Sequence, residues 1–136
     1  MPLIGSGENK WQIVHTDDVI SAVVFCLEHE ETEGEIFNVA EEQASTLNEL
    51  ITAVQKEYGI QENKKHVPVW LGYFLGFFNS LVCRITRKPN ILSQDNIQRI
   101  IKNRWYSIEK LKKLGWKPNY DMKQSIRWII RELEKR

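Results

Sequence analysis

Four side chains of this sequence are of the types that bind a small organic ligand: two tryptophans, a phenylalanine and an arginine. Indole and phenyl rings cover the apolar part of a ligand, and a guanidinium pairs with a carboxylate or a phosphate. Trp70 and Phe74 stand four positions apart in a long apolar segment, whereas Trp11 and Arg104 are distant in the sequence. We predict that Trp11, Trp70, Phe74 and Arg104 contact a substrate, with Arg84 as a further contact for an anion.

Other kinds of chemistry find little support in the residue pattern. The acidic segment 28–33 with its histidine resembles a metal cluster, but consecutive residues at a helix end face in many directions, as in a solvated turn. His15 fits a hydrogen-bonded strand histidine better than a catalytic base, and Asp18 fits a helix cap better than a general base. Residues 5–7 lack the third glycine and following helix of a dinucleotide-binding loop. We predict no metal ligand and no catalytic residue.

One segment near the start of the chain determines how these side chains are positioned. Residues 11–15 alternate as an extended strand does, and residues 19–27 are almost all apolar. A threonine or aspartate at 16–18 can cap the helix that follows, because its oxygen accepts hydrogen bonds from amides left free in the first turn. We predict a buried strand that leads directly into a helix over 17–30, and that this helix is buried on most sides.

Hydrophobic periodicity predicts five further helices, which begin near residues 47, 69, 93, 108 and 121. Thr46 and Glu49 fit a capping box, and Asp121 fits the cap of the last helix. Segments 35–40 and 104–106 are rich in β-branched or aromatic residues and are predicted to be short strands. The predicted fold class is therefore α/β and mainly helical, with about six helices and strands at about 11–15, 35–40 and 104–106.

Composition limits the class of protein. The chain has 136 residues, with 19 basic and 18 acidic side chains, and a formal net charge of +1. This length suits one domain with one core, and the balanced charge gives no indication of nucleic acid binding. Cys26 and Cys83 lie in apolar helical runs without a metal or redox spacing, which is typical of reduced thiols. We predict a single portion over 1–136 and a cytoplasmic location.

Residues 67–85 are the one segment that suggests contact with a membrane. They are mostly aromatic and aliphatic, reach roughly the length that spans a bilayer, and carry a single charge at Arg84. Pro68, Gly72 and Gly76 interrupt the segment. The main prediction is a buried helix or one that lines an apolar substrate pocket, and the alternative is a helix in contact with the membrane interface.

Four motifs follow one another along the chain: Val14–Val19, Gly34–Ala40, Ser45–Leu50, and Trp105–Lys110 together with Leu114–Pro118. In this order and spacing they resemble the C-terminal part of extended short-chain dehydrogenases/reductases, the NAD-dependent epimerase/dehydratase family. The resemblance covers nearly the whole chain. Nucleotide-sugar members of the family often have an arginine at about the position of Trp11, so the resemblance favours the 3β-hydroxysteroid dehydrogenase-like side.

The resemblance implies that the chain is a C-terminal, substrate-binding portion of such an enzyme. It implies a small-molecule substrate, either apolar and steroid-like or a nucleotide sugar, and NAD or NADP for the complete enzyme. In the family a glycine-rich loop holds the cofactor, and a Tyr-x-x-x-Lys pair supplies acid–base chemistry. We expect this chain to lack both features, to bind no cofactor alone and to have no activity by itself.

Without an N-terminal Rossmann-type half, the predicted fold is incomplete. It leaves a sheet edge and the apolar faces of the 17–30 helix uncovered, and such surfaces associate with a missing half or with another copy. The competing prediction is a non-enzymatic interaction module, or one half of a split gene, that docks to a partner or to a membrane through its apolar helix.

Overall fold

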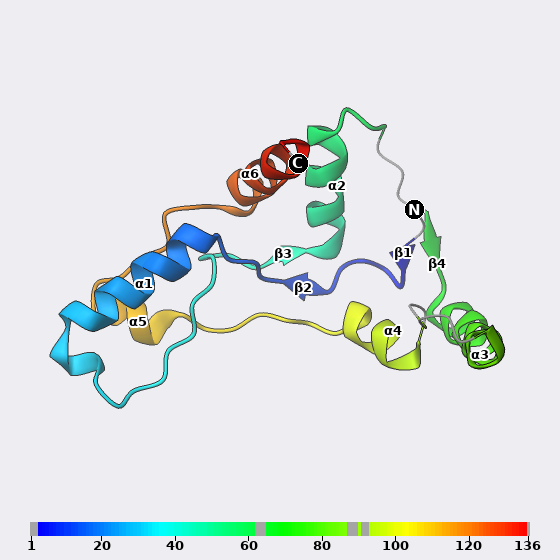
Figure 1. The fold of residues 1–136 in the computed structure, drawn as a ribbon, viewed down its shortest axis with the longest axis horizontal. Helices are drawn as coiled ribbons and strands as arrows, with labels where there is room; N and C mark the ends of the chain where they lie inside the picture. Colours follow the sequence, from blue (N-terminus) through cyan, green and yellow to red (C-terminus); the bar gives the residue numbers. More distant parts are fainter. Residues whose placement is uncertain (1–2, 62–64, 87–89, 91–92, 136) are drawn as a thin grey trace.

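The computed structural model describes residues 3–61, 65–86, 90 and 93–135. In these residues the chain is mainly helical (Figure 1), and the predicted α/β class with six α-helices is confirmed. The helices are α1 (Thr16–Glu28), α2 (Leu47–Glu57), α3 (Val69–Thr86), α4 (Gln94–Ile101), α5 (Glu109–Lys113) and α6 (Met122–Glu134), with a short 3-10 helix at Glu30–Thr32. The strands are β1 (Leu3–Ile4), β2 (Lys10–Trp11), β3 (Ser45–Thr46) and β4 (His66–Val67).

Two small sheets join segments that are distant in the sequence. β1 pairs in parallel with β4, and β2 pairs antiparallel with β3. Trp11 of β2 also forms a parallel bridge with Arg104. The central strand β2 therefore lies between the segment that precedes α2 and the segment that follows α4, and it runs through the middle of Figure 1.

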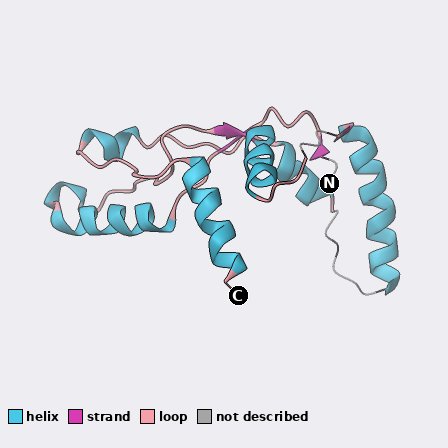
Figure 2. Ribbon diagram, turned by 90° about the horizontal axis from the view of Figure 1, so that it is seen from above, coloured by secondary structure: helices cyan, strands magenta, loops and turns pink. Residues whose placement is uncertain are grey.

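The apolar interior is divided into two clusters. One lies between α1, α5 and their connecting loops, and its buried members are Ala22, Ala40, Ile108, Leu111 and Trp116. The other lies between α6 and α2, and its members are Met122, Ile126 and Ile130, with Ile13, Leu50 and Ala53 packed against them. Helix α3 takes part in neither cluster. Figure 2 shows it at one edge of the molecule, away from α1, α5 and α6.

Local signals in the sequence set the starts of α2 and α6. Thr46 Oγ1 accepts a hydrogen bond from the Glu49 amide, and Glu49 Oε2 accepts one from the Thr46 amide at 2.7 Å. Asp121 and Gln124 form the same reciprocal pair. Both capping predictions are confirmed, because each box needs only residues three positions apart.

The prediction for the cap and the burial of α1 is wrong. His15 is the N-cap residue, and its Nδ1 atom accepts a hydrogen bond from the Asp17 amide at 3.2 Å. Only Asp18 and Ala22 of this helix are buried, whereas Leu27 is 82% exposed. An apolar run is buried only where another element covers it, and no described element covers the outer face of α1.

The predicted strands are also corrected. Residues 35–40 form no β-ladder, residues 12–15 lie beyond the end of β2, and the 104–106 segment is reduced to the bridge at Arg104. A strand needs backbone partners along its length, and β-propensity reflects packing against such neighbours. The side chain of Asn38 donates a hydrogen bond to the Ser107 carbonyl, but this is a single contact and not a ladder.

Gly7 occupies a turn that only glycine accommodates. Its φ is +72°, and a Cβ atom there would lie 2.2 Å from Asn48 Oδ1 and 2.6 Å from Leu3 Cδ2. Because the left-handed backbone costs an L-residue about 1–2 kcal/mol and the clash adds to it, we expect Gly7→Ala to lower the free energy of unfolding by about 2–3 kcal/mol. Urea denaturation followed by circular dichroism measures this loss.

Gly34→Ala is the matched control for that variant. Gly34 has a similar φ of +70°, but no atom lies within 4 Å of its added Cβ. It should therefore lose only the backbone contribution, about 1 kcal/mol. Equal losses in the two variants would show that the contact between Gly7 and Asn48 has no energetic weight.

Candidate functional site

The structure brings together two of the four side chains predicted to contact a substrate. The guanidinium carbon of Arg104 lies 5.1 Å from the ring centroid of Trp11, a distance typical of a cation–π contact. Both residues are partly buried. The Trp11 Nε1 atom is buried and has no hydrogen-bond partner among the described residues, and Arg104 forms no ion pair with them.

Backbone hydrogen bonds hold this Trp11–Arg104 pair in place. The Arg104 amide donates to the Lys10 carbonyl at 2.6 Å, and the Gln12 amide donates to the Arg104 carbonyl at 3.0 Å. The Gln12 side chain extends the connection, because its Oε1 accepts from the Tyr106 amide at 2.7 Å. The paired backbones fix the ring and the guanidinium, so an apolar face lies beside a positive charge that no described acidic residue neutralises.

The other two predicted side chains lie elsewhere. Trp70 and Phe74 belong to α3 and are 69% and 55% exposed. Among the described residues no aromatic or cation–π contact joins them to Trp11 or Arg104. In this structure they therefore form part of an exposed helix surface, and their placement in a closed substrate pocket stays a prediction.

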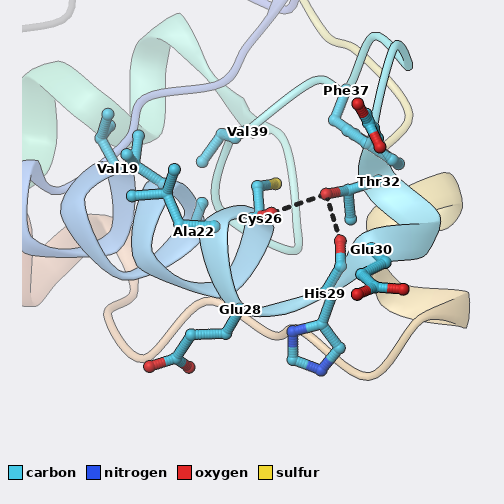
Figure 3. A pocket seen from close by; sticks show the side chains of 12 residues that line it. Val19, Ala22, Cys26, Glu28, His29, Glu30, Thr32, Phe37 and Val39 are labelled. Atoms are coloured by element: carbon cyan, nitrogen blue, oxygen red, sulfur yellow. Dashed lines mark hydrogen bonds between the residues drawn. The ribbon is translucent and has the colours of Figure 1, made fainter.

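An open apolar groove lies along α1, the helix whose apolar faces we predicted to be uncovered. It has a volume of about 700 Å³ and is lined by Val19, Ala22, Val23, Cys26, Phe37 and Val39, among others. Figure 3 shows these side chains between α1 and the extended segment that carries Val39. At one end Thr32 Oγ1 donates to the carbonyls of Cys26 and His29, each at 2.7 Å, which closes the helix end.

Asp18 has a structural role that the sequence analysis missed. Its side chain is 1% exposed, and its two oxygens accept hydrogen bonds from the Asn119 and Tyr120 amides at 2.7 and 3.2 Å. The carboxylate thus joins the first turn of α1 to the turn that precedes α6. Asp18 is therefore neither the predicted cap nor placed as a general base, and no periodic signal could have paired it with residues so distant in sequence.

His15 is buried beside the same turn. Its ring stacks on Tyr120 with centroids 3.9 Å apart and meets Trp128 edge-on at 4.8 Å. The charge of Asp17 and, next, desolvation raise the pKa of the Tyr120 hydroxyl. His15 is hydrogen-bonded through Nδ1, as predicted, but as the cap of α1 rather than within a strand.

Glu41 is the most strongly perturbed acid among the described residues. It is 4% exposed, and burial raises the pKa of its carboxyl from 4.5 to about 7, with a smaller contribution from the charge of Asp121. Among the described residues, its side chain accepts a hydrogen bond from the backbone amide of Ile13 at 3.3 Å. Glu41 faces the junction of the central strand with α6, away from any described catalytic group, so its perturbed pKa concerns stability.

The predicted absence of a Tyr-x-x-x-Lys pair is wrong as a statement about spacing, because Tyr106 and Lys110 stand four positions apart. The contacts of Lys110 nevertheless lead away from the phenol. Its Nζ donates to Glu35 and to the Ile36 carbonyl, and it lies over the Phe37 ring. Tyr106 precedes α5, so the two side chains do not share one helix face, and the pair does not form an acid–base unit in this structure.

The part of the chain that the structure describes contains no group of three or more His, Cys, Asp or Glu side chains that could hold a metal ion. Cys26 and Cys83 form no disulfide. Helix α3 is long and apolar enough to cross a membrane by length and composition, and it is the one described helix of this kind.

The fold defines the class of protein first. The structure superposes on a dTDP-glucose 4,6-dehydratase of Bacillus anthracis, solved in complex with NAD, with a TM-score of 0.63 and 20% identity. The match covers 98% of this chain and 34% of the dehydratase. The chain therefore has the fold of one part of a larger Rossmann-type enzyme.

Sequence comparisons agree with the resemblance inferred from the motifs. Residues 1–40 match the model of the NAD dependent epimerase/dehydratase family. The chain is 25% identical over 134 residues to the decarboxylating sterol-4-alpha-carboxylate 3-dehydrogenase of Mus musculus. It is 18% identical over 124 residues to the N-acetyl-alpha-D-glucosaminyl-diphospho-ditrans,octacis-undecaprenol 4-epimerase of Escherichia coli O157:H7. The resemblance to the NAD-dependent epimerase/dehydratase family is thus confirmed.

The alignments cover most of this chain but only a part of each relative. Both alignments cover 91% of this chain, but only 37% of the sterol dehydrogenase and 38% of the epimerase. The chain therefore spans little more than a third of the length of these relatives. The activity of a complete enzyme is a matter for proposal.

Proposed function

We propose that this chain is the substrate-binding C-terminal portion of an NAD(P)-dependent epimerase, dehydratase or dehydrogenase, and that it is not catalytic by itself. The Trp11–Arg104 pair carries the proposal. A partly buried guanidinium that forms no ion pair within the described part of the chain attracts an anionic group, and the adjoining indole ring covers an apolar one. Backbone pairing on the central strand holds Trp11 and Arg104 in place, and a binding site needs side chains that are fixed in this way.

The same pair favours a substrate that combines an apolar body with a negative charge. The sterol carboxylate and the diphosphate-linked undecaprenol in the names of the two relatives both have this character. A nucleotide sugar, such as the dTDP-glucose of the dehydratase, carries the charge without the large apolar body. We therefore place a steroid-like or lipid-linked anion first and a nucleotide sugar second.

The surface along α1 is where we expect the cofactor-binding half of the enzyme to pack. The groove along α1 combines exposed apolar side chains with the extended segment 35–40, which has no ladder partner among the described residues. Apolar surface and free backbone groups of this kind suit a neighbouring strand and helix layer. We propose that a Rossmann-type half, which would bind NAD or NADP, packs here. Self-association through this edge and a cytoplasmic location stay predictions.

A non-enzymatic interaction module is the second candidate. The exposed apolar residues of α1 and α3 favour it, because both helices could dock to a partner. An immunoblot of source-cell extract with an antibody against α6 separates the two candidates. A band well above 16.1 kDa supports a longer enzyme, and a band at 16.1 kDa favours a module or a separately encoded half.

Direct binding tests the proposed substrate site. We expect a steroid carboxylate to shift the indole N–H resonance of Trp11 in nitrogen-15 NMR spectra, because this group has no hydrogen-bond partner among the described residues. Arg104→Gln should weaken the binding about tenfold, since it removes a charge-assisted contact. Trp11→Phe identifies the resonance by removing it. dTDP-glucose, titrated in the same way, compares the second substrate class.

Arg131→Gln provides the matched control, because Arg131 is an exposed arginine on α6, away from the central strand. It should bind the steroid carboxylate like the unchanged chain. The substrate-site proposal would be abandoned if neither ligand shifted Trp11, or if both arginine variants weakened binding equally.

A further inference from the structure

Helix α3 has an unusual distribution of side chains. The residues that face the rest of the chain are small, because Gly72 and Gly76 are its only buried positions. A Cβ atom on Gly72 would lie 2.8 Å from Ile4 Cγ2, so β1 packs directly against the helix backbone. The helix therefore approaches the protein through glycines and leaves its large side chains on the outside.

Those large side chains form a continuous exposed surface, which we call the α3 apolar surface. Each of its residues is between 47% and 77% exposed, and they are Trp70, Phe74, Leu75, Phe77, Phe78, Leu81, Val82 and Ile85. Most of them recur at three- and four-residue spacings, which places them side by side along the helix. The helix has no acidic residue. This is the reverse of an ordinary surface helix, whose apolar residues face the core.

Asn90, a described residue beyond the end of α3, forms polar contacts with the helix. Asn90 accepts a hydrogen bond from Asn79 Nδ2 and donates one to Ser80 Oγ, both at 2.7 Å. Asn90 therefore lies beside the middle of α3, although the helix ends at Thr86. β4, which precedes α3, pairs with β1, and α4, which follows α3 in the sequence, packs against it, so described segments on both sides of the helix belong to the same protein body. This arrangement fits a helix that lies in the plane of an interface and does not cross a membrane.

Positive charge is concentrated in the segment of the sequence that contains α3. Residues 65–104 contain seven Lys or Arg and one Asp, a formal charge of +6, within a chain whose net charge is +1. The remaining residues therefore carry a net charge of −5. Arg84 stands in the last turn of α3, and Arg99 in the last turn of α4, which packs against it. Such a segment is attracted to an anionic surface.

We propose that α3 docks onto a lipid bilayer that contains anionic lipid, with the α3 apolar surface in the boundary between headgroups and acyl chains. Arg84 and Arg99, in the last turns of α3 and α4, face the headgroups, and α3 lies parallel to the membrane plane. Trp70 near the start of the helix suits the interface, where indole rings bind preferentially. The proposal is independent of the substrate-binding role proposed above.

Charge decides between the bilayer and a second copy of this chain. Two copies that joined through α3 would bring together two segments of like charge, which opposes association. An anionic bilayer offers both an apolar layer and the opposite charge. It therefore complements the two properties of this surface at once.

Vesicle flotation with the purified chain tests the proposal. We expect binding to phosphatidylcholine vesicles that contain roughly a quarter phosphatidylglycerol, and at least about tenfold weaker binding to phosphatidylcholine alone. Leu81→Ser combined with Val82→Ser should weaken binding about tenfold, because both side chains are exposed on α3. Arg84→Gln should weaken it about fivefold, and added salt should act in the same direction.

Matched controls keep the test specific. Val23→Ser combined with Leu27→Ser removes the same two residue types from the exposed face of α1 and should leave vesicle binding unchanged. Arg131→Gln is the control for charge. No binding to either vesicle would overturn the proposal, as would equal loss in the α1 and α3 double variants. A dimer in sedimentation analysis that only the α3 variant dissociates would assign the surface to a second copy instead.

Discussion

Replacing Asp18 by alanine should lower the free energy of unfolding by about 3–4 kcal/mol. The buried carboxylate accepts hydrogen bonds from the Asn119 and Tyr120 amides, and a hydrogen bond to a charged group contributes about 1.5–3 kcal/mol. Alanine would leave both amides buried without partners and would free the turn before α6. Urea denaturation followed by tryptophan fluorescence measures the loss.

Two further variants separate the hydrogen bonds from the charge. Asp18→Asn keeps one acceptor oxygen, so we expect it to lose about 2 kcal/mol. Asp17→Ala removes the neighbouring carboxylate, whose side chain is 57% exposed, and it should cost less than about 1 kcal/mol. If Asp17→Ala were as damaging as Asp18→Ala, the effect would belong to the first turn of α1 in general and not to the buried contact.

Glu41→Gln should stabilise the protein in alkaline solution. Burial raises the pKa of the folded-state carboxyl to about 7, whereas the unfolded chain has the ordinary value of 4.5. Between these two pH values the unfolded state ionises and the folded state does not, so the stability of the unchanged chain falls as the pH rises. Glutamine avoids this loss, which amounts to about 3 kcal/mol above pH 7 because one pKa unit corresponds to about 1.4 kcal/mol.

The pH dependence is the decisive readout for Glu41. The stability difference between the Gln variant and the unchanged chain should be small near pH 4 and should reach its full value at about pH 8. Glu42→Gln serves as the control, because Lys112 holds the pKa of the exposed Glu42 below its ordinary value, and this variant should gain nothing as the pH rises. A difference for Glu41→Gln that did not change with pH would show that its carboxyl titrates normally in the fold.

The helix starts show what could be predicted from the sequence. The capping boxes of α2 and α6 involve residues three positions apart, and the apolar periodicity of α6 repeats within a few residues. Interactions of this range are present in the sequence itself, so the positions of six helices could be inferred correctly. The family resemblance was also available, because it rests on ordered motifs and not on contacts.

The errors of prediction share one cause. Residues 35–40 have the composition of a strand but no ladder partner, and α1 has an apolar sequence but an exposed outer face. A ladder and a buried face each require a second element, and the sequence of one segment does not say whether that element is present. Asp18 shows the converse, because its partners lie at the far end of the chain.

For the candidate site, too, the residue types could be read from the sequence but the contacts between them could not. Trp11, Arg104, Trp70 and Phe74 were predicted to contact a ligand from their residue types, and types are a property of the sequence. Only the tertiary structure decided that Trp11 meets Arg104 across the central strand while Trp70 and Phe74 lie on the outside of α3. The sequence by itself determined the helices, the family resemblance and the local charge, because these depend on near neighbours. The pairing of distant residues depends on the path of the whole chain, and so it appeared only in the fold.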